Sequence, residues 1–235
     1  MFEKKVRQFH DVLEILRRAT GNRAEAVRRR GFDLSIIDSV IYTIQQTLGS
    51  VADSLPNPNQ SRKRVGQLFE GLIKLIIEAV GVNCEGRTIK IPIPGHPDRS
   101  MTYELDMVLS RRNAIVASET QFIAPEEIVG SIKTTSKDRI DKVFLDKFLM
   151  SKLLDRNVKV VAIFLHDVQR ARRGGSIFGI NSTFKTNHFL GYSIALNPLD
   201  GVYYVDSRPV MVEEPDLAKR IGSFSRFLTR DIWEI

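Results

Sequence analysis

Two polar residues stand inside apolar stretches whose composition is typical of β-strands. Asp106 lies within residues 103–109, between Leu105 and Met107, and Lys133 ends the apolar stretch 128–133. One way to hydrolyse a phosphodiester uses one or two divalent cations held by carboxylates, an activated water, and a cation such as lysine near the scissile phosphate. Acids and a lysine that do this chemistry must converge on one edge of a sheet.

Each of these residues also has an ordinary structural interpretation. Strand alternation puts Glu104 and Asp106 on one face, and an acid between Leu and Met would be costly if it were fully buried. Taken alone, Asp106 is compatible with a solvated strand position and Lys133 with a common strand end. Lys133 differs in preceding a helix-start pattern, a place from which a side chain can project into a cleft.

The order of these residues resembles a family. It is similar to the PD-(D/E)XK nucleases, and within them to the type II restriction endonucleases that recognise CCGG or CC(N)GG-like sites, the EcoRII/PspGI-like branch. The resemblance spans roughly residues 65 to 150, and Asp106 stands where that branch has its metal-binding acid. Ser131 and Lys133 match its Ser-x-Lys element, and Asp146 follows Lys133 by thirteen residues, as the displaced acid does.

The resemblance implies a set of site residues. Asp106, Asp146 and the helix glutamate Glu70 would hold Mg²⁺, and Lys133 and Ser131 would complete the catalytic group. Three departures from the branch are visible: no proline precedes Asp106, Asp146 replaces the usual glutamate, and Lys137 stands where an arginine is usual. Glu70 also forms an i, i+4 charge ladder with Lys74 and Glu78, which is its structural alternative.

Lys137, Asp138 and Arg139 match the element with which this branch reads G·C pairs. The chemistry is suitable, because a basic side chain can donate to O6 and N7 of guanine and a carboxylate can accept from N4 of cytosine. The structural alternative is that Asp138 caps the following helix, since Thr135 and Asp138 form a capping-box pattern.

A second register for the metal site is also open. In this register Glu119, in Glu119-Thr120-Gln121, supplies the acid that acts with Asp106. It leaves Lys133 unexplained and ranks lower, but Glu119 remains an alternative catalytic residue.

Further basic residues could contact DNA phosphates. Arg170, Arg172 and Arg173 precede two glycines and could provide the salt-sensitive part of the affinity, with Lys185 as another candidate. A solvated loop is the alternative. The four histidines show no spacing of a zinc site or a catalytic triad, and no phosphate-binding Gly-x-x-x-x-Gly-Lys loop is present, so no nucleotide cofactor is expected.

The elements that must position these residues follow from apolar periodicity. Helices are predicted near residues 6–16, 36–48 and 65–80, with an arginine-rich segment at 23–30 and a loop or linker at 54–60. Strands are predicted at 88–93, 102–109, 114–117, 128–133, 158–165, 192–196 and 202–205, with a helix after Thr135. The order indicates an α/β fold, a restriction-endonuclease-like mixed sheet flanked by helices. We expect an N-terminal helical subdomain (1–60) and a nuclease core with C-terminal DNA-contacting loops (61–235).

The composition agrees with an anionic partner without identifying it. The net charge of +7 suits nucleic acid or an acidic membrane face. The single cysteine, Cys84, excludes an internal disulfide and favours a reducing cytosol, and no signal peptide or membrane span is visible. Together with these features, the resemblance implies a cytoplasmic prokaryotic protein that binds double-stranded DNA as a homodimer, since a palindromic site calls for a symmetric reader. A repair or recombination nuclease and a non-catalytic DNA-binding protein on the same fold are the alternatives.

Overall fold

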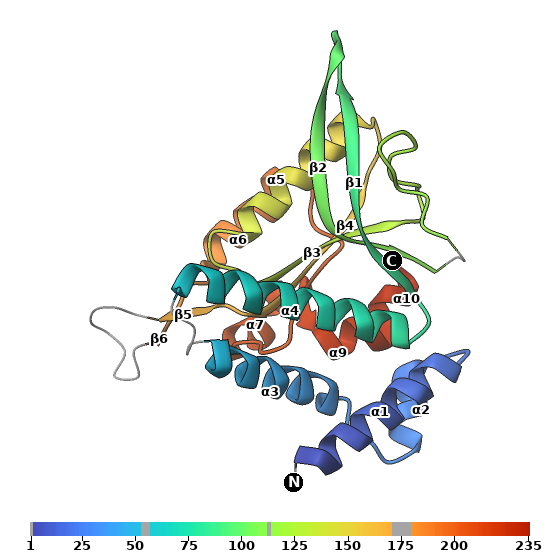
Figure 1. The fold of residues 1–235 in the computed structure, drawn as a ribbon, viewed down its shortest axis with the longest axis vertical. Coiled ribbons are helices and arrows are strands. Elements are labelled where there is room, and N and C mark those ends of the chain that lie inside the picture. The colour runs from blue at the N-terminus through green and yellow to red at the C-terminus, as the bar shows by residue number, and fades with distance from the viewer. Residues whose placement is uncertain (1, 53–56, 112–113, 171–179) are drawn as a thin grey trace.

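The computed structural model describes residues 2–52, 57–111, 114–170 and 180–235 (Figure 1). Its helices are α1 (Phe2–Arg18), α2 (Arg23–Arg29), α3 (Ser35–Ala52), α4 (Pro58–Ala79), α5 (Ile140–Leu153), α6 (Thr186–Ala195), α7 (Pro209–Glu213), α8 (Pro215–Ala218), α9 (Phe224–Arg226), the π-helical η1 (Phe227–Asp231) and α10 (Ile232–Glu234). Its strands are β1 (Asn83–Ile93), β2 (His96–Ser110), β3 (Ile128–Thr135), β4 (Lys159–His166), β5 (Val168–Arg170), β6 (Ile180–Ser182), β7 (Gly201–Tyr204) and β8 (Ile221–Ser223).

Six strands form one mixed sheet in the order β1-β2-β3-β4-β7-β8. The pairs β1–β2 and β2–β3 are antiparallel, and the pairs β3–β4, β4–β7 and β7–β8 are parallel. β4 is buried along all six interior positions, as expected of a parallel strand covered on both faces. The predicted α/β fold with a mixed sheet is confirmed.

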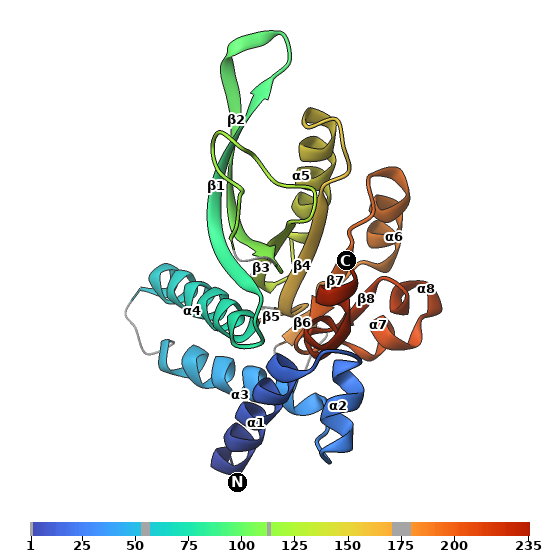
Figure 2. The same ribbon diagram turned by 90° about the vertical axis from the view of Figure 1, so that its right-hand side faces the viewer.

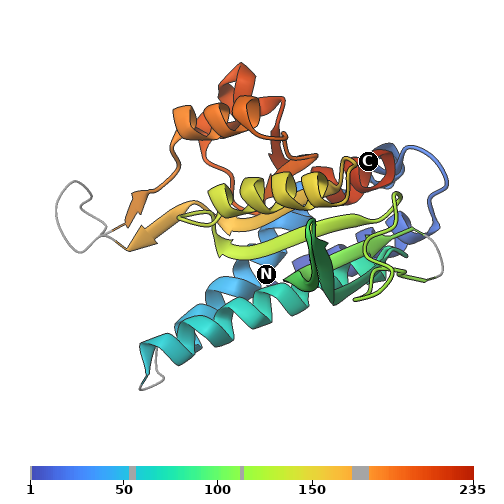
Figure 3. The ribbon, with the colours of Figure 1, turned by 90° about the horizontal axis from the view of Figure 1, so that it is seen from above.

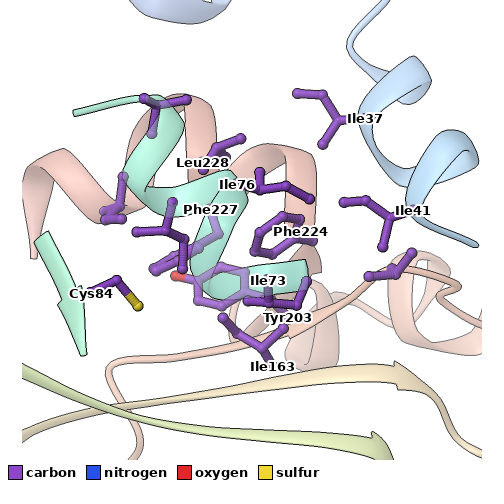
Figure 4. Close-up of a cluster of buried hydrophobic side chains, with 14 of the residues drawn as sticks. Ile37, Ile41, Ile73, Ile76, Cys84, Ile163, Tyr203, Phe224, Phe227 and Leu228 are labelled. Carbon is purple, nitrogen blue, oxygen red and sulfur yellow. The ribbon is translucent and has the colours of Figure 1, made fainter. Parts of the chain in front are cut away.

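Helices cover both faces of the sheet, with α5 on one side and α4 on the other (Figure 3). One apolar cluster joins α1, α3, α4, α9 and η1 to the face that carries Met107, Ile132 and Ile163. Figure 4 shows part of this cluster, with Cys84 beside the aromatic rings as a buried core residue. A second cluster joins α5 and α6 to the opposite face through Val108, Val129 and Ala162.

The hairpin β1–β2 extends well beyond the rest of the sheet (Figure 2). Its strands pair with each other from Asn83↔Ser110 out to Ile93↔His96, and Gly95 at the turn has a φ of +77°. Such a φ is easily adopted only by glycine. The base of this hairpin contains Asp106, so the hairpin fixes the backbone on which that carboxylate is carried.

The predicted third helix is present and begins earlier than predicted. Asn57 caps α4 by accepting hydrogen bonds from the backbone N–H groups of Asn59 and Gln60 at 3.0 and 3.3 Å. At the other end Gly81, with a φ of +91°, stops the helix as predicted, and its N–H donates to Glu78 O. The predicted loop at 54–60 therefore contains the start of α4, while residues 53–56 lie outside the described part of the chain.

Three local predictions were wrong. Residues 114–117 form a loop rather than a strand, with one isolated bridge between Ser118 and Phe122. Residues 192–196 are not a strand but the end of α6, in which Phe189 and Ser193 are buried one helical turn apart. The expected capping box fails because Asp138 has a φ of +51° and lies in a turn, so that α5 begins after it at Ile140.

The N-terminal helices pack on the same apolar cluster as the sheet. Val12, Ile37 and Ile41 lie in one cluster with Ile73 of α4 and Phe224 of α9. The arginine-rich segment, for which no element was predicted, forms the short helix α2. The division at residue 60 remains a prediction, and within the described ranges no helix is both long and apolar enough to span a membrane.

Asp38 links the N-terminal region to the C-terminal one. It lies on α3, and its carboxylate accepts a hydrogen bond from Ser225 N at 3.0 Å. Burial raises the pKa of Asp38 from 3.8 to about 7, although the hydrogen bond with Ser225 lowers it. Because the folded chain keeps this proton between about pH 4 and pH 7 while the unfolded chain has lost it, the Asp38 contribution destabilises the fold increasingly across that range.

We predict that Asp38→Asn stabilises the protein at pH 8 by about 2–4 kcal/mol and has little effect near pH 4. The amide keeps an oxygen for Ser225 N and carries no charge to be desolvated. Urea denaturation at both pH values measures the difference, with the exposed Asp216→Asn as a matched control that should change stability little at either pH. A stabilisation by Asp38→Asn that is equal at both pH values would contradict this account.

Candidate active site

A cavity of about 500 Å³ lies between β2, β3 and α5. It brings together most of the residues predicted to do chemistry, although they come from three elements. Its charged lining residues are Glu104, Asp106, Lys133, Arg139, Lys142 and Asp146, and Ser131 also lines it.

The cavity exists because β2 and β3 separate. Their backbone pairing covers only Met107↔Gly130, Val108↔Val129 and Leu109↔Ile128, and β2 then continues into the projecting hairpin. Val108 and Val129 pack with α5 residues, so strand alternation directs Asp106, Ser131 and Lys133 to the α5 side. The predicted face of Asp106 is therefore the face that carries the cavity.

The Asp106 carboxylate forms the hydrogen bonds between β2 and β3 beyond the point where their backbone pairing ends. Its Oδ2 accepts hydrogen bonds from Ser131 Oγ at 3.1 Å and from the backbone N–H of Ile132 at 2.9 Å. It also forms an ion pair with Lys133 Nζ. The Asp106 side chain is 19% exposed, so this is a partly desolvated carboxylate with one lysine as its counterion.

Asp146 reaches the cavity from α5, whose position is fixed by the neighbouring residue. Lys147 is only 2% exposed, and its Nζ lies 2.6 Å from Asp200 Oδ2, which also accepts from Val160 N at 2.6 Å. Through Asp200 the buried Lys147 ties α5 to Val160 of β4, because a lysine is buried only when its charge is paired. Asp146 then faces the β2 side of the cavity, where it adds to the effect of burial in raising the pKa of Tyr103.

Lys142 is a site residue that the sequence reasoning missed. Its Nζ lies 2.5 Å from Asp146 Oδ2, one helical turn away on α5. The i, i+4 spacing of Lys142 and Asp146 was the available signal, but it is common on exposed helices. The cavity thus contains two carboxylate–lysine pairs, Asp106 with Lys133 and Asp146 with Lys142.

This set of side chains can bind both a divalent cation and a phosphate. Carboxylate oxygens are the ligands that Mg²⁺ prefers, and Mg²⁺ needs only one or two of them because it retains water and binds substrate phosphates. Within the described ranges no three His, Cys, Asp or Glu side chains lie close enough to form a complete metal site. Asp106 and Asp146 line the same cavity and supply carboxylate oxygens of the kind that Mg²⁺ binds, and the basic residues supply donors of the kind that phosphate binds.

Glu70 is not brought into this cavity. It lies on α4, across the sheet from α5, and its Oε1 is 2.5 Å from Lys74 Nζ. Lys74 Nζ and the backbone oxygen of Asp106 lie 3.3 and 3.5 Å from the position that a Cβ on Gly86 would occupy. The Glu70–Lys74 pair thus lies near the Asp106 backbone, and neither of its residues lines the cavity.

Glu119 is also outside the cavity. It lies in the loop that follows β2, and its Oε2 is 2.7 Å from Lys90 Nζ of β1, with both side chains about half exposed. The loop is held by Glu127, which is 1% exposed and accepts hydrogen bonds from the backbone N–H groups of Val116, Ala117 and Ala124. The structure therefore groups Asp106 with Asp146, and not with Glu119.

The predicted base-reading residues lie in the turn between β3 and α5. Asp138 is exposed and Arg139 lines the cavity, while Lys137 Nζ lies 3.8 Å from Asp138 Oδ2. Lys185 is exposed directly before α6. Arg170 ends β5, and Arg172 and Arg173 lie outside the described residues.

Solved structures with this fold include two restriction endonucleases. The crystal structure of the Type IIP restriction endonuclease Kpn2I aligns with a TM-score of 0.65 and 19% sequence identity, over 99% of this chain and 71% of that chain. The complex of the restriction endonuclease PspGI with substrate DNA aligns with a TM-score of 0.50 and 13% identity, over 99% and 90% of the two chains. No family model and no curated sequence matches. The chain therefore has the fold of a restriction endonuclease, a mixed sheet flanked by helices.

Proposed function

We propose that this protein is a type II restriction endonuclease that cuts both strands of DNA by Mg²⁺-dependent phosphodiester hydrolysis. The observation that carries the proposal is the convergence of Asp106, Lys133 and Asp146 on one cavity of this fold. The proposed target is a CCGG or CC(N)GG-like palindrome, in keeping with the resemblance of the 131–146 segment to that branch of the family. A palindromic target implies a homodimer, in which each subunit reads one half-site.

Asp106 and Asp146 would hold the ion. When bound, Mg²⁺ supplies charge neutralisation at the phosphate and an activated water. Lys142 keeps the Asp146 carboxylate paired and inside the cavity, and Ser131 and Ile132 orient the Asp106 carboxylate through their hydrogen bonds. For Glu70, which lies outside the cavity, we propose only a role at a second metal or in orienting water.

Lys133 would act directly on the phosphate. Asp106 holds its ammonium group at the cavity, and the Lys133 side chain is 37% exposed, so that it remains within reach of a substrate. A cation in this position stabilises the negative charge that develops on the phosphate oxygens and can position the attacking water. The role is electrostatic, and it requires the Asp106 pairing to be loose enough for the phosphate to share the lysine.

Recognition would come from the turn before α5. Lys137 and Arg139 would donate to guanine, and Asp138, whose side chain is exposed, would accept from cytosine. Arg170, Arg172, Arg173 and Lys185 are proposed to contact phosphates, which would make the affinity depend on salt. The turn is only a few residues from Lys133, so base reading and cleavage would be coupled by a short piece of backbone.

The first of three predictions about this function tests the activity. Purified protein with plasmid DNA and Mg²⁺ should give discrete bands, none in EDTA, and Lys133→Ala should cut about 10²–10³-fold more slowly because the phosphate charge is no longer stabilised. Lys219→Ala, at an exposed lysine of α8's C-terminal end, is the matched control. Absence of cutting with both Mg²⁺ and Mn²⁺ would refute the proposal that the protein is a nuclease. Cutting of only branched or damaged DNA would indicate a repair nuclease.

The second prediction separates the two candidate acids. Asp146→Ala should abolish detectable cleavage, and Glu119→Ala should retain it within a few-fold, because only Asp146 shares the cavity with Asp106. The same plasmid assay measures both variants at several Mg²⁺ concentrations. The reverse result, with Glu119 essential and Asp146 dispensable, would assign the second register of the metal site.

The third prediction concerns specificity. Arg139→Ala should lose specific cleavage, with a loss of about 1–3 kcal/mol in discrimination, while non-specific DNA binding persists. Competition binding between a cognate duplex and one with altered G·C pairs measures this difference. Arg18→Ala, at an exposed arginine paired with Glu14, is the control. An Arg139→Ala variant that cuts its site normally would rule out the base-reading role.

A further inference from the structure

A second cavity, of about 840 Å³, lies between α2 and the C-terminal helices. It shares no lining residue with the cavity that contains Asp106. The aromatic residues of α9 and η1 beside it pack in the cluster that covers the opposite face of the sheet from α5. It is therefore a site separate from the proposed active site.

Four arginines line this cavity from opposite ends of the chain. Arg23 and Arg28 come from the arginine-rich segment, and Arg226 and Arg230 come from α9 and η1. Bringing like charges together in a concave surface costs free energy unless acids or a bound anion offset it. The number of acids beside these arginines therefore indicates whether a bound anion is needed to offset their repulsion.

The C-terminal pair of arginines is partly neutralised. Arg226 Nε and Arg230 Nε lie 3.0 and 2.6 Å from the two oxygens of the buried Asp231, and Arg230 Nε is also 3.7 Å from Glu234. Asp231 additionally accepts a hydrogen bond from Tyr203 OH at 3.0 Å. Each guanidinium has five N–H donors, so these acids leave donors of both arginines for another acceptor.

The N-terminal pair has no such acids. In the described part of the chain, neither Arg23 nor Arg28 forms an ion pair within 4.0 Å. The charge of Arg28 contributes to lowering the pKa of Asp33, but the Asp33 carboxylate already accepts a hydrogen bond from Ser35 N. Arg23 Cζ lies 3.4 Å from the centroid of the Trp233 ring, and the buried Arg23 Nε has no hydrogen-bond partner. Burial also lowers the pKa of Arg23. The contact with the Trp233 ring is favourable, but it leaves the Nε–H donor of Arg23 without an acceptor, and an anion placed here would supply one.

We propose that this cavity binds a phosphate-bearing ligand through Arg23 and Arg28, with Arg226 and Arg230 completing the site. Guanidinium groups bind phosphate oxygens with paired, charge-assisted hydrogen bonds, and arginine suits this better than lysine. The phosphate can belong to the backbone of a duplex that lies away from the active-site cavity, or to a free oligophosphate. The site gives a role to two of the four arginines at residues 23–30, Arg23 and Arg28.

Trp233 is the only tryptophan of the chain and lines the cavity, so its fluorescence reports on this site alone. Two probes are titrated separately in EDTA, which prevents cleavage: inorganic tripolyphosphate, and a short duplex of A·T pairs only. The expected result is a saturable change in fluorescence. Arg28→Gln should weaken the affinity for the probe by about tenfold or more, the effect of losing one charge-assisted hydrogen bond. Arg23→Gln should weaken it to the same extent.

Arg29→Gln is the matched control, because it removes the same charge from the same helix at a residue that is paired with Glu25 and does not line the cavity. It should bind both probes within about twofold of the unaltered protein, and the melting temperatures of all variants verify folding. A response to the duplex assigns the phosphate to DNA, and a response to tripolyphosphate alone assigns it to a free ligand. No saturable response to either probe, or an equal loss in Arg29→Gln, would overturn the proposal.

Discussion

The site depends on how the gap between β2 and β3 is closed. The two strands pair through only three residues each, and beyond them the backbone N–H of Ile132 has no pairing residue on β2. Asp106 supplies the acceptor with its side chain, and the same oxygen binds Ser131 and Lys133. A backbone donor left unpaired in a partly buried place is unfavourable, so this carboxylate has a structural role before any substrate arrives. The residue proposed to bind the metal is thus also the one that joins the two strands.

Helix α5 combines two uses of charge in adjacent residues. Lys147 and Asp200 form a buried pair that positions the helix, whereas Lys142 and Asp146, at 66% and 27% exposure, form a pair at the cavity that substrate can reach. The first pair is costly to break, because loss of one partner leaves a buried charge. The second can exchange partners with little loss, because water still reaches it. A rigid helix therefore carries a replaceable ion pair.

Local sequence patterns predicted the parts of the structure that are decided locally. The continuous apolar stretch of β4 and the periodicity and final glycine of α4 required no knowledge of distant contacts. The alternation around Asp106 gave the correct face of β2, and its order relative to Lys133 and Asp146 indicated the cavity.

The failures involve tertiary contacts and backbone conformations that apolar periodicity does not reveal. The loop at 114–117 is determined by Glu127, and α6 by the packing of Phe189 against Phe144 and Phe184. The cavity with four arginines could not be predicted, because it is assembled from both ends of the chain. Asp138 adopts a left-handed backbone conformation, which few non-glycine residues adopt. The capping-box pattern was misleading there because it assumes that Asp138 lies in the first turn of the helix.

The close approach of β2 and β3 at Gly130 also links two positions. A Cβ at residue 130 would lie 1.9 Å from Met107 Cε and 2.6 Å from Met107 Cγ, and Met107 is completely buried. A larger residue at 130 thus requires a smaller one at 107, with the total volume kept nearly constant. Among sequences that conserve this site, the two positions should covary, and in a mutational library they would have to be randomised as one unit.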